Sequence, residues 1–87
     1  IEKAIVDMYF EVTRKRIPFE ISELVHLLKN TIPRTKIDYT KLLRAAARRN
    51  VLPEFVRILN ELGINIPHYE LEDIANKNIE KILKMLR

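Results

Sequence analysis

Apolar residues in this 87-residue chain recur every three to four positions, and that spacing constrains the fold more than any other feature of the sequence. No segment alternates apolar and polar side chains as a half-buried strand would, and no internal repeat is present. Four prolines and a single glycine divide the helical pattern into short stretches. We therefore expect an all-α fold, a compact orthogonal bundle of five or six short helices.

The first predicted helix covers residues 1–16 and is apolar on two sides. Its main stripe falls at helical spacing and consists of Ile1, Ala4, Ile5, Met8, Tyr9 and Val12. A second stripe on roughly the opposite side consists of Val6, Phe10 and Ile17. Either the other helices wrap this helix and bury both stripes, or the second stripe is a docking surface for a second copy of the chain or a larger protein subunit.

Proline and capping residues delimit the next two helices. Pro18 interrupts the first helix, and a second helix is predicted over about 19–30. Thr35, followed by Asp38 three residues later, resembles a capping box with Asp in place of the usual Glu or Gln. This pattern predicts that Thr35 opens a third helix, which ends near Arg49.

The rest of the chain predicts a fourth helix and a helical C-terminal region. Pro53 suits the first turn of a helix over about 53–62, and Gly63 followed by an apolar residue is the signature of a left-handed helix stop. From residue 68 onward the apolar positions keep one helical phase. Either one long helix covers 68–87, or the helix breaks near 76–78.

The excess positive charge lies almost entirely in residues 34–49. This window carries six basic side chains and one acidic one, a net charge of +5, whereas the segments before and after it carry 0 and −1. Within the third helix, Lys41, Arg44 and Arg48 project within about 60° of each other, opposite the apolar side. These three residues are called the basic row below.

A row of long cations on a helix can contact the phosphates of a nucleic acid. The simpler interpretation is a solvated face, because the helix dipole favours cations near a C-terminal end. Apart from Asp38, however, no acidic neighbour neutralises the row, so we expect it to bind the nucleic-acid backbone. The predicted contact residues are Arg34, Lys36, Lys41, Arg44, Arg48 and Arg49.

Residues 42–59 resemble a helix-turn-helix motif. Ala46 occupies the small position of the first helix, Asn50 stands where glycine commonly turns the chain, and Val51 follows it. Arg49 departs from the motif, because the residue before the turn is normally apolar. The second helix would present poor base readers to a groove, namely Leu52, Pro53, Glu54, Phe55, Arg57 and Ile58. The resemblance therefore implies a helix pair that contacts phosphates with little sequence specificity.

The sequence offers little for catalysis, metal binding or a cofactor. It has no cysteine and one serine, and its carboxylates are scattered among basic side chains. Two His–Glu pairs have ligand spacing, namely His26 with Glu23 and His68 with Glu72. Each pair would supply at most two ligands of a metal site. We therefore expect no enzymatic activity, no metal and no cofactor.

The aromatic residues give no separate signal of nucleic-acid binding. Tyr9, Tyr39 and Tyr69 are interpreted as core or core-edge residues, because base-stacking platforms usually lie on exposed sheets. Twelve isoleucines, no glutamine and one glycine favour a heat-adapted source, although six asparagines argue the other way.

Length and composition place the chain in a broad class. Eighty-seven residues make a single helical domain over 1–87, which we expect to be cut or trimmed from a longer chain because it begins at Ile1. No apolar run approaches the roughly 18 residues of a membrane span. The absence of cysteine is typical of intracellular proteins, so we expect a cytoplasmic location.

These observations predict a small nucleic-acid-binding module, or an accessory subunit of a DNA- or RNA-handling complex, that grips the phosphate backbone. The alternative is an adaptor between proteins, which docks through the second stripe of the first helix. Its partner would be a larger subunit or a second copy of the chain. Neither hypothesis involves a membrane.

Overall fold

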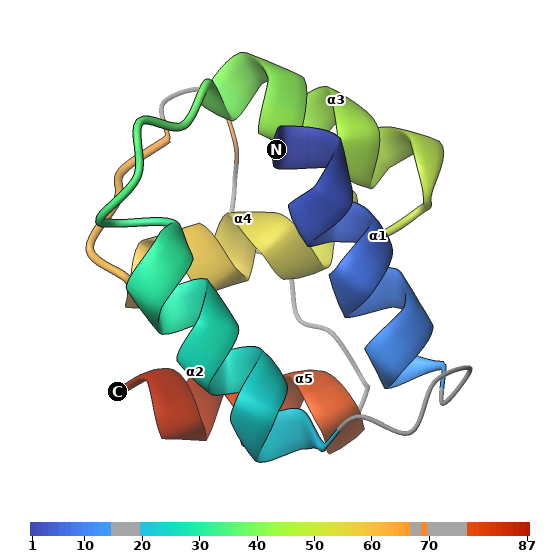
Figure 1. Cartoon of the computed structure of the whole chain (residues 1–87), viewed down its shortest axis with the longest axis vertical. Coiled ribbons are helices and arrows are strands. Elements are labelled where there is room, and N and C mark those ends of the chain that lie inside the picture. Colours follow the sequence, from blue (N-terminus) through green and yellow to red (C-terminus); the bar gives the residue numbers. More distant parts are fainter. Residues whose placement is uncertain (15–19, 67–68, 70–76) are drawn as a thin grey trace.

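The structure, a computed structural model, describes residues 1–14, 20–66, 69 and 77–87. In these residues the chain forms five α-helices and no strand (Figure 1), namely α1 (Glu2–Thr13), α2 (Ile21–Thr31), α3 (Tyr39–Arg48), α4 (Leu52–Glu61) and α5 (Lys77–Leu86). The predicted all-α fold is thereby confirmed. The radius of gyration is 11.8 Å, close to the value of about 12 Å expected for a compact domain of this length. None of the described helices is long and apolar enough to cross a membrane.

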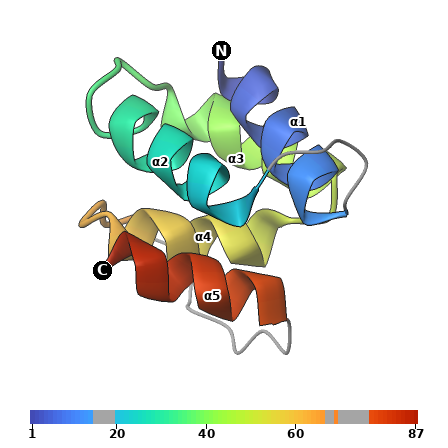
Figure 2. The ribbon, with the colours of Figure 1, turned by 60° about the horizontal axis from the view of Figure 1, so that its bottom comes forward.

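Helices α1, α2 and α3 lie on one side of the molecule, and α4 and α5 lie side by side on the other (Figure 2). α1 contacts α2 and α3, α4 contacts α3 and α5, and α2 contacts α5. Tyr9 of α1 meets Phe55 of α4 edge to face in the core, with ring centroids 4.9 Å apart. The other large side chains that are fully buried are Leu24, Leu28, Ile32, Leu42, Ile58, Leu59, Ile79, Ile82, Val6 and Val51.

Helix α1 ends at Thr13 rather than at residue 16 as predicted. Arg14 is its C-cap residue, and the Thr13 hydroxyl donates a hydrogen bond to the Tyr9 carbonyl at 2.8 Å. Pro18 lacks the N–H that would donate to the Arg14 carbonyl in a continued helix. A residue that precedes proline also avoids helical geometry, so the sequence disfavours an extension of α1.

The prediction that Thr35 opens α3 is wrong, because the N-cap is Asp38. The Asp38 carboxylate accepts a hydrogen bond from the Lys41 backbone N–H at 3.2 Å. The Thr35 N–H instead donates to the Thr31 carbonyl at 2.9 Å, in the turn that follows α2. In a capping box, the third residue of the helix accepts from the backbone N–H of the N-cap. Here Glu2 of α1 takes that role, since its carboxylate accepts from the Asp38 N–H at 3.1 Å.

The left-handed stop predicted at Gly63 is confirmed. α4 ends at Glu61, and Gly63 has a φ of 82°. The Ile64 N–H donates to the Leu59 carbonyl at 2.9 Å. The Gly63 N–H donates to the Asn60 carbonyl at 3.0 Å. These two hydrogen bonds form a Schellman motif, which satisfies carbonyls that the end of the helix would otherwise leave without a partner.

The turn between α3 and α4 has the same hydrogen-bond pattern, with Asn50 in place of glycine. Asn50 has a φ of 59°, which asparagine tolerates better than most residues with a side chain. The Val51 N–H donates to the Ala46 carbonyl at 2.9 Å. The Asn50 N–H donates to the Ala47 carbonyl at 3.1 Å. The chain thereby reverses in a few residues, and α4 begins in contact with α3.

The remaining helices follow the sequence pattern closely. α2 and α4 begin and end within two residues of the predicted positions. The alternatives for 68–87 are one long helix or a break near 76–78. Residues 70–76 lie outside the described residues, and the chain is helical over Lys77–Leu86. At the end of α5, the Arg87 guanidinium pairs with the Glu61 carboxylate at 3.2 Å, which joins α5 to the end of α4.

Candidate nucleic-acid interface

Helix α3 has one buried side and one basic side. The helix packs against α1 and α4, and its buried residues are Leu42, Leu43, Ala45 and Ala46. Lys41, Arg44 and Arg48 are all exposed. Among the described residues, none of their three side chains forms an ion pair. The structure therefore brings the members of the basic row to one exposed face of α3, as the helical phase predicts.

Two further predicted contact residues lie on the chain just before α3. Arg34 and Lys36 belong to the segment between α2 and α3, and both are exposed. Neither takes part in an ion pair with any described residue. Their backbone leads into the N-terminus of α3, so these two cations extend the exposed positive charge beyond the helix itself.

The sixth predicted contact residue, Arg49, is engaged by α1. Its Nε lies 3.1 Å from a carboxylate oxygen of Asp7, and its guanidinium lies 4.9 Å from the centre of the Phe10 ring. The Arg49 side chain is 39% exposed. A cation over an aromatic face is attracted to the ring, and the ion pair adds to that attraction. Arg49 thus contributes to the packing of α3 on α1, which accounts for an arginine where the helix-turn-helix pattern has an apolar residue.

Two carboxylates lie at the N-terminal end of the basic row. Asp38 caps α3, and Glu2 of α1 accepts the hydrogen bond from the Asp38 backbone N–H. That hydrogen bond, with smaller contributions that include the charge of Lys41, lowers the pKa of Glu2 from its ordinary value of 4.5. Glu2 is therefore ionised at neutral pH. The sequence pointed only to Asp38, because helical phase does not show which residue of α1 meets α3.

The structure describes two residues of the second apolar stripe of α1, Val6 and Phe10. Val6 has no exposed surface and belongs to the core, which corrects its prediction as a partner-binding residue. Phe10 is partly buried, and the guanidinium groups of Arg14 and Arg49 lie 4.5 and 4.9 Å from its ring centre. Ile17 lies outside the described residues. For Val6, the alternative in which other helices wrap α1 is the one that holds, because α1 packs against both α2 and α3.

Helix α4 exposes few of the side chains that the helix-turn-helix resemblance assigned to base reading. Glu54, Phe55 and Ile58 are buried, so they do not project into solvent. The reason is that α4 contacts α3 and α5 at once and is covered on two sides.

A buried titratable pair consists of Tyr9 of α1 and Glu54 of α4. Tyr9 and Glu54 are close enough to influence each other, and burial is the largest cause that raises the pKa of each above its ordinary value. The nearby charge of Arg14 acts in the opposite direction on both groups. The pair lies inside the domain and not on the basic face.

A groove lies beside the basic row, between the start of α3 and the segment that follows α4. Its volume is about 810 Å³, and the described residues that line it are Tyr39, Thr40, Leu43, Arg44, Asn65, Ile66 and Tyr69. Arg44 therefore belongs both to the groove and to the basic row. A smaller adjoining pocket of about 170 Å³ shares Asn65, Ile66 and Tyr69 and extends to α4. Sequence reasoning missed this groove, because Tyr69, interpreted as a core or core-edge residue, is 44% exposed.

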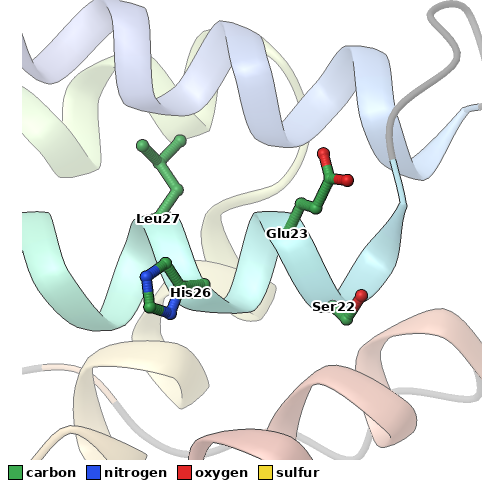
Figure 3. Close-up of a pocket in the computed structure, with 4 residues that line it drawn as sticks. All are labelled: Ser22, Glu23, His26 and Leu27. Carbon is green, nitrogen blue, oxygen red and sulfur yellow. The ribbon is translucent and has the colours of Figure 1, made fainter.

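A second depression, of about 490 Å³, lies on α2 and includes the possible metal ligands Glu23 and His26 (Figure 3). Ser22 and Leu27 complete its described lining. Within the described part of the chain, no three histidine, cysteine or acidic side chains gather as a metal site would require. The other pair with ligand spacing, His68 with Glu72, lies outside the described residues.

Comparisons of this chain with protein-family models, with curated proteins and with solved structures find no significant match. The function is therefore inferred from the charge, exposure and contacts of the residues above.

Proposed function

We propose that the chain is a small nucleic-acid-binding module, or an accessory subunit of a DNA- or RNA-handling complex. It grips the phosphate backbone with little sequence specificity. The observation that carries this proposal is the exposed basic row of α3, whose side chains form no ion pair with a described residue. Cations of this kind gain affinity by displacing the counterions of a nucleic acid, whatever its sequence.

The predicted contact residues contribute unequally in this proposal. Arg44 and Arg48 contribute most, because no carboxylate of a described residue pairs with them. Lys41 contributes less, since it lies close to the ionised Glu2. Arg49 contributes least, because an ion pair and an aromatic ring already hold its guanidinium. The two cations before α3 extend the surface along the bound strand.

We further propose that α3 and α4 act as a helix-turn-helix-like pair within an orthogonal bundle. The tight turn at Asn50 and the contact between the two helices support this arrangement. In this pair the first helix binds the backbone and the second anchors it to the core. The burial of Glu54, Phe55 and Ile58 supports binding without base reading, because sequence readout needs side chains that reach base edges.

The test is binding of the intact domain to duplex and single-stranded oligonucleotides of unrelated sequence across a salt series. Affinity should fall as salt rises, with a log–log slope of about −0.9 per duplex phosphate neutralised, and with a Kd on the order of 10⁻⁴–10⁻⁶ M at physiological salt. Replacing Lys41, Arg44 and Arg48 together with alanine should flatten that slope by about two to three units and weaken binding to every sequence similarly. Of the single variants, Lys41→Ala should flatten it least.

The matched control is the double variant Lys81→Ala/Lys84→Ala. Both lysines are exposed on α5, so this variant also removes exposed helical cations, but outside the basic row. Equal effects of the two variants would reduce the basic row to a contribution of general electrostatics. No detectable binding of any oligonucleotide at about 50 mM salt would overturn the proposal, because nonspecific electrostatic binding is strongest at low salt.

The adaptor alternative has no specific observation in its favour. Its predicted surface needs Val6, Phe10 and Ile17 to be available together on α1. Val6 is fully buried, and the guanidinium groups of Arg14 and Arg49 lie over the Phe10 ring. An accessory subunit remains part of the proposal, with the basic row as its functional surface.

A further inference from the structure

The groove beside the basic row combines aromatic, polar and cationic groups on one surface. Tyr39 opens α3 and is partly buried, whereas Tyr69 comes from the segment after α4 and is 44% exposed. Leu43 and Ile66 add apolar surface, and Arg44 supplies the charge. The groove of about 810 Å³ falls within the range of roughly 300–1,000 Å³ that is usual for small-molecule sites.

These groups match the parts of an unpaired nucleotide. An aromatic ring offers a face on which any base can stack, without sequence preference. The Thr40 hydroxyl and the Asn65 amide can bond to polar atoms of a base or sugar. Arg44 can bond to the attached phosphate with a charge-assisted hydrogen bond. A base that is paired within a duplex cannot use such a groove, because its faces are already stacked on its neighbours.

We infer that the groove binds an unpaired base of a single-stranded nucleic acid, stacked against Tyr69 or Tyr39, while the basic row holds the neighbouring phosphates. This inference rests on the proposed function and gives it a substrate class. Arg44 connects the two parts, since it lines the groove and lies between Lys41 and Arg48 along α3. The expected ligand chemistry is shared by DNA and RNA single strands.

The decisive comparison keeps the number of phosphates constant and removes the bases. The intact domain is titrated with a single-stranded oligodeoxyuridylate, with an abasic deoxyribose strand of equal length, and with an oligouridylate, which differs from the first strand only in its sugar. The two base-bearing strands should bind about 5- to 150-fold more tightly than the abasic strand, the range expected for one stacked base. A difference between the first and third strands separates DNA from RNA.

Tyrosine emission gives a second readout, because the chain has three tyrosines and no tryptophan. Two of the tyrosines line the groove, and Tyr9 is fully buried. Stacking of a base on Tyr39 or Tyr69 should quench the emission, whereas the abasic strand should leave it nearly unchanged. Whichever of Tyr69 and Tyr39 stacks on the base, its replacement with alanine should weaken binding to the base-bearing strands by up to the factor found on removal of the bases. Its replacement with phenylalanine should retain most of the affinity.

Met85→Ala is the matched control, since Met85 is an exposed large apolar residue on α5, outside the groove. It should leave all affinities unchanged. Equal affinity for the abasic and base-bearing strands, with a normal salt dependence, would overturn the base-binding inference and leave the phosphate proposal intact. Absence of binding to all three strands at low salt would overturn both. The comparison of strands needs no variant, so a folding defect in Tyr69→Ala or Tyr39→Ala does not affect it.

Discussion

Replacing Gly63 with alanine should destabilise the domain through backbone strain alone. Gly63 has a φ of 82°, and a Cβ atom built on it meets no atom within 4 Å beyond its own residue and its two chain neighbours. The added methyl group therefore causes no collision with the surrounding structure. Its cost comes from the left-handed backbone, in which the Cβ of an L-residue lies too close to its own peptide group.

The magnitude of this effect follows from the left-handed penalty and the size of the domain. The penalty is about 1–2 kcal/mol for an ordinary L-residue. For 87 residues, an unfolding entropy of about 2.1 cal/mol/K per residue gives about 0.18 kcal/mol/K. The Tm of Gly63→Ala should therefore be lower by about 5–11 °C.

Thermal unfolding followed by circular dichroism or calorimetry measures this change directly. Gly63→Asn is the informative companion variant, since the chain already accepts asparagine in the same left-handed position at Asn50. It should lose clearly less stability than Gly63→Ala, because asparagine tolerates this backbone region. An unchanged Tm for the alanine variant, or an equal loss in both variants, would refute strain at this helix stop as the cause.

Two further outcomes follow from single positions. Asn50→Gly should raise the free energy of unfolding by at most about 1 kcal/mol. Glycine avoids the left-handed penalty of about 1–2 kcal/mol at the end of α3, but it loses about 0.5–1 kcal/mol more backbone entropy on folding. The same thermal melts measure the change, and a loss of stability would contradict the prediction. Because burial raises the pKa of Glu54 above 4.5, the folded chain holds this proton more tightly than the unfolded chain. The contribution of this proton to the free energy of unfolding is fully present below about pH 4.5. It is lost as pH rises through the pKa of Glu54 in the folded chain. In urea melts from pH 4 to 8, Glu54→Gln should remove this fall in the free energy of unfolding. The variant should keep the opposite pH dependence that comes from Glu2, because the lowered pKa of Glu2 stabilises the folded chain above pH 4.5.

The features predicted correctly depend on residues that are close together in the sequence. The basic row follows from a spacing of three and four residues, which places side chains on one face of any α-helix. The stop at Gly63 depends on hydrogen bonds that span at most five residues. In both cases local geometry determines the result, whatever the rest of the chain does.

The features that the sequence did not reveal depend on contacts between distant residues. The hydrogen bond from Asp38 to Glu2 spans 36 positions, and the ion pair of Arg49 with Asp7 spans 42. Helical phase shows that a helix has two apolar sides but not which helices will cover them, so Val6 was open to two interpretations. The groove was missed for the same reason. Tyr39 and Tyr69 are 30 positions apart, and they line the same groove only because the segment after α4 lies beside the start of α3.

The packing of α1 on α3 also determines which positive charge remains on the surface. α1 supplies Glu2 at the N-terminal end of α3 and Asp7 at its C-terminal end, so carboxylates lie close to the first cation of the helix and to Arg49. Arg44 and Arg48 lie between these ends on the exposed face, where no described carboxylate pairs with them. Arg44 also lines the groove. Under the proposed function, the remaining charge draws a nucleic acid to the side of α3 on which the groove opens. The proposed phosphate contacts and the proposed base contact then meet at one residue, Arg44.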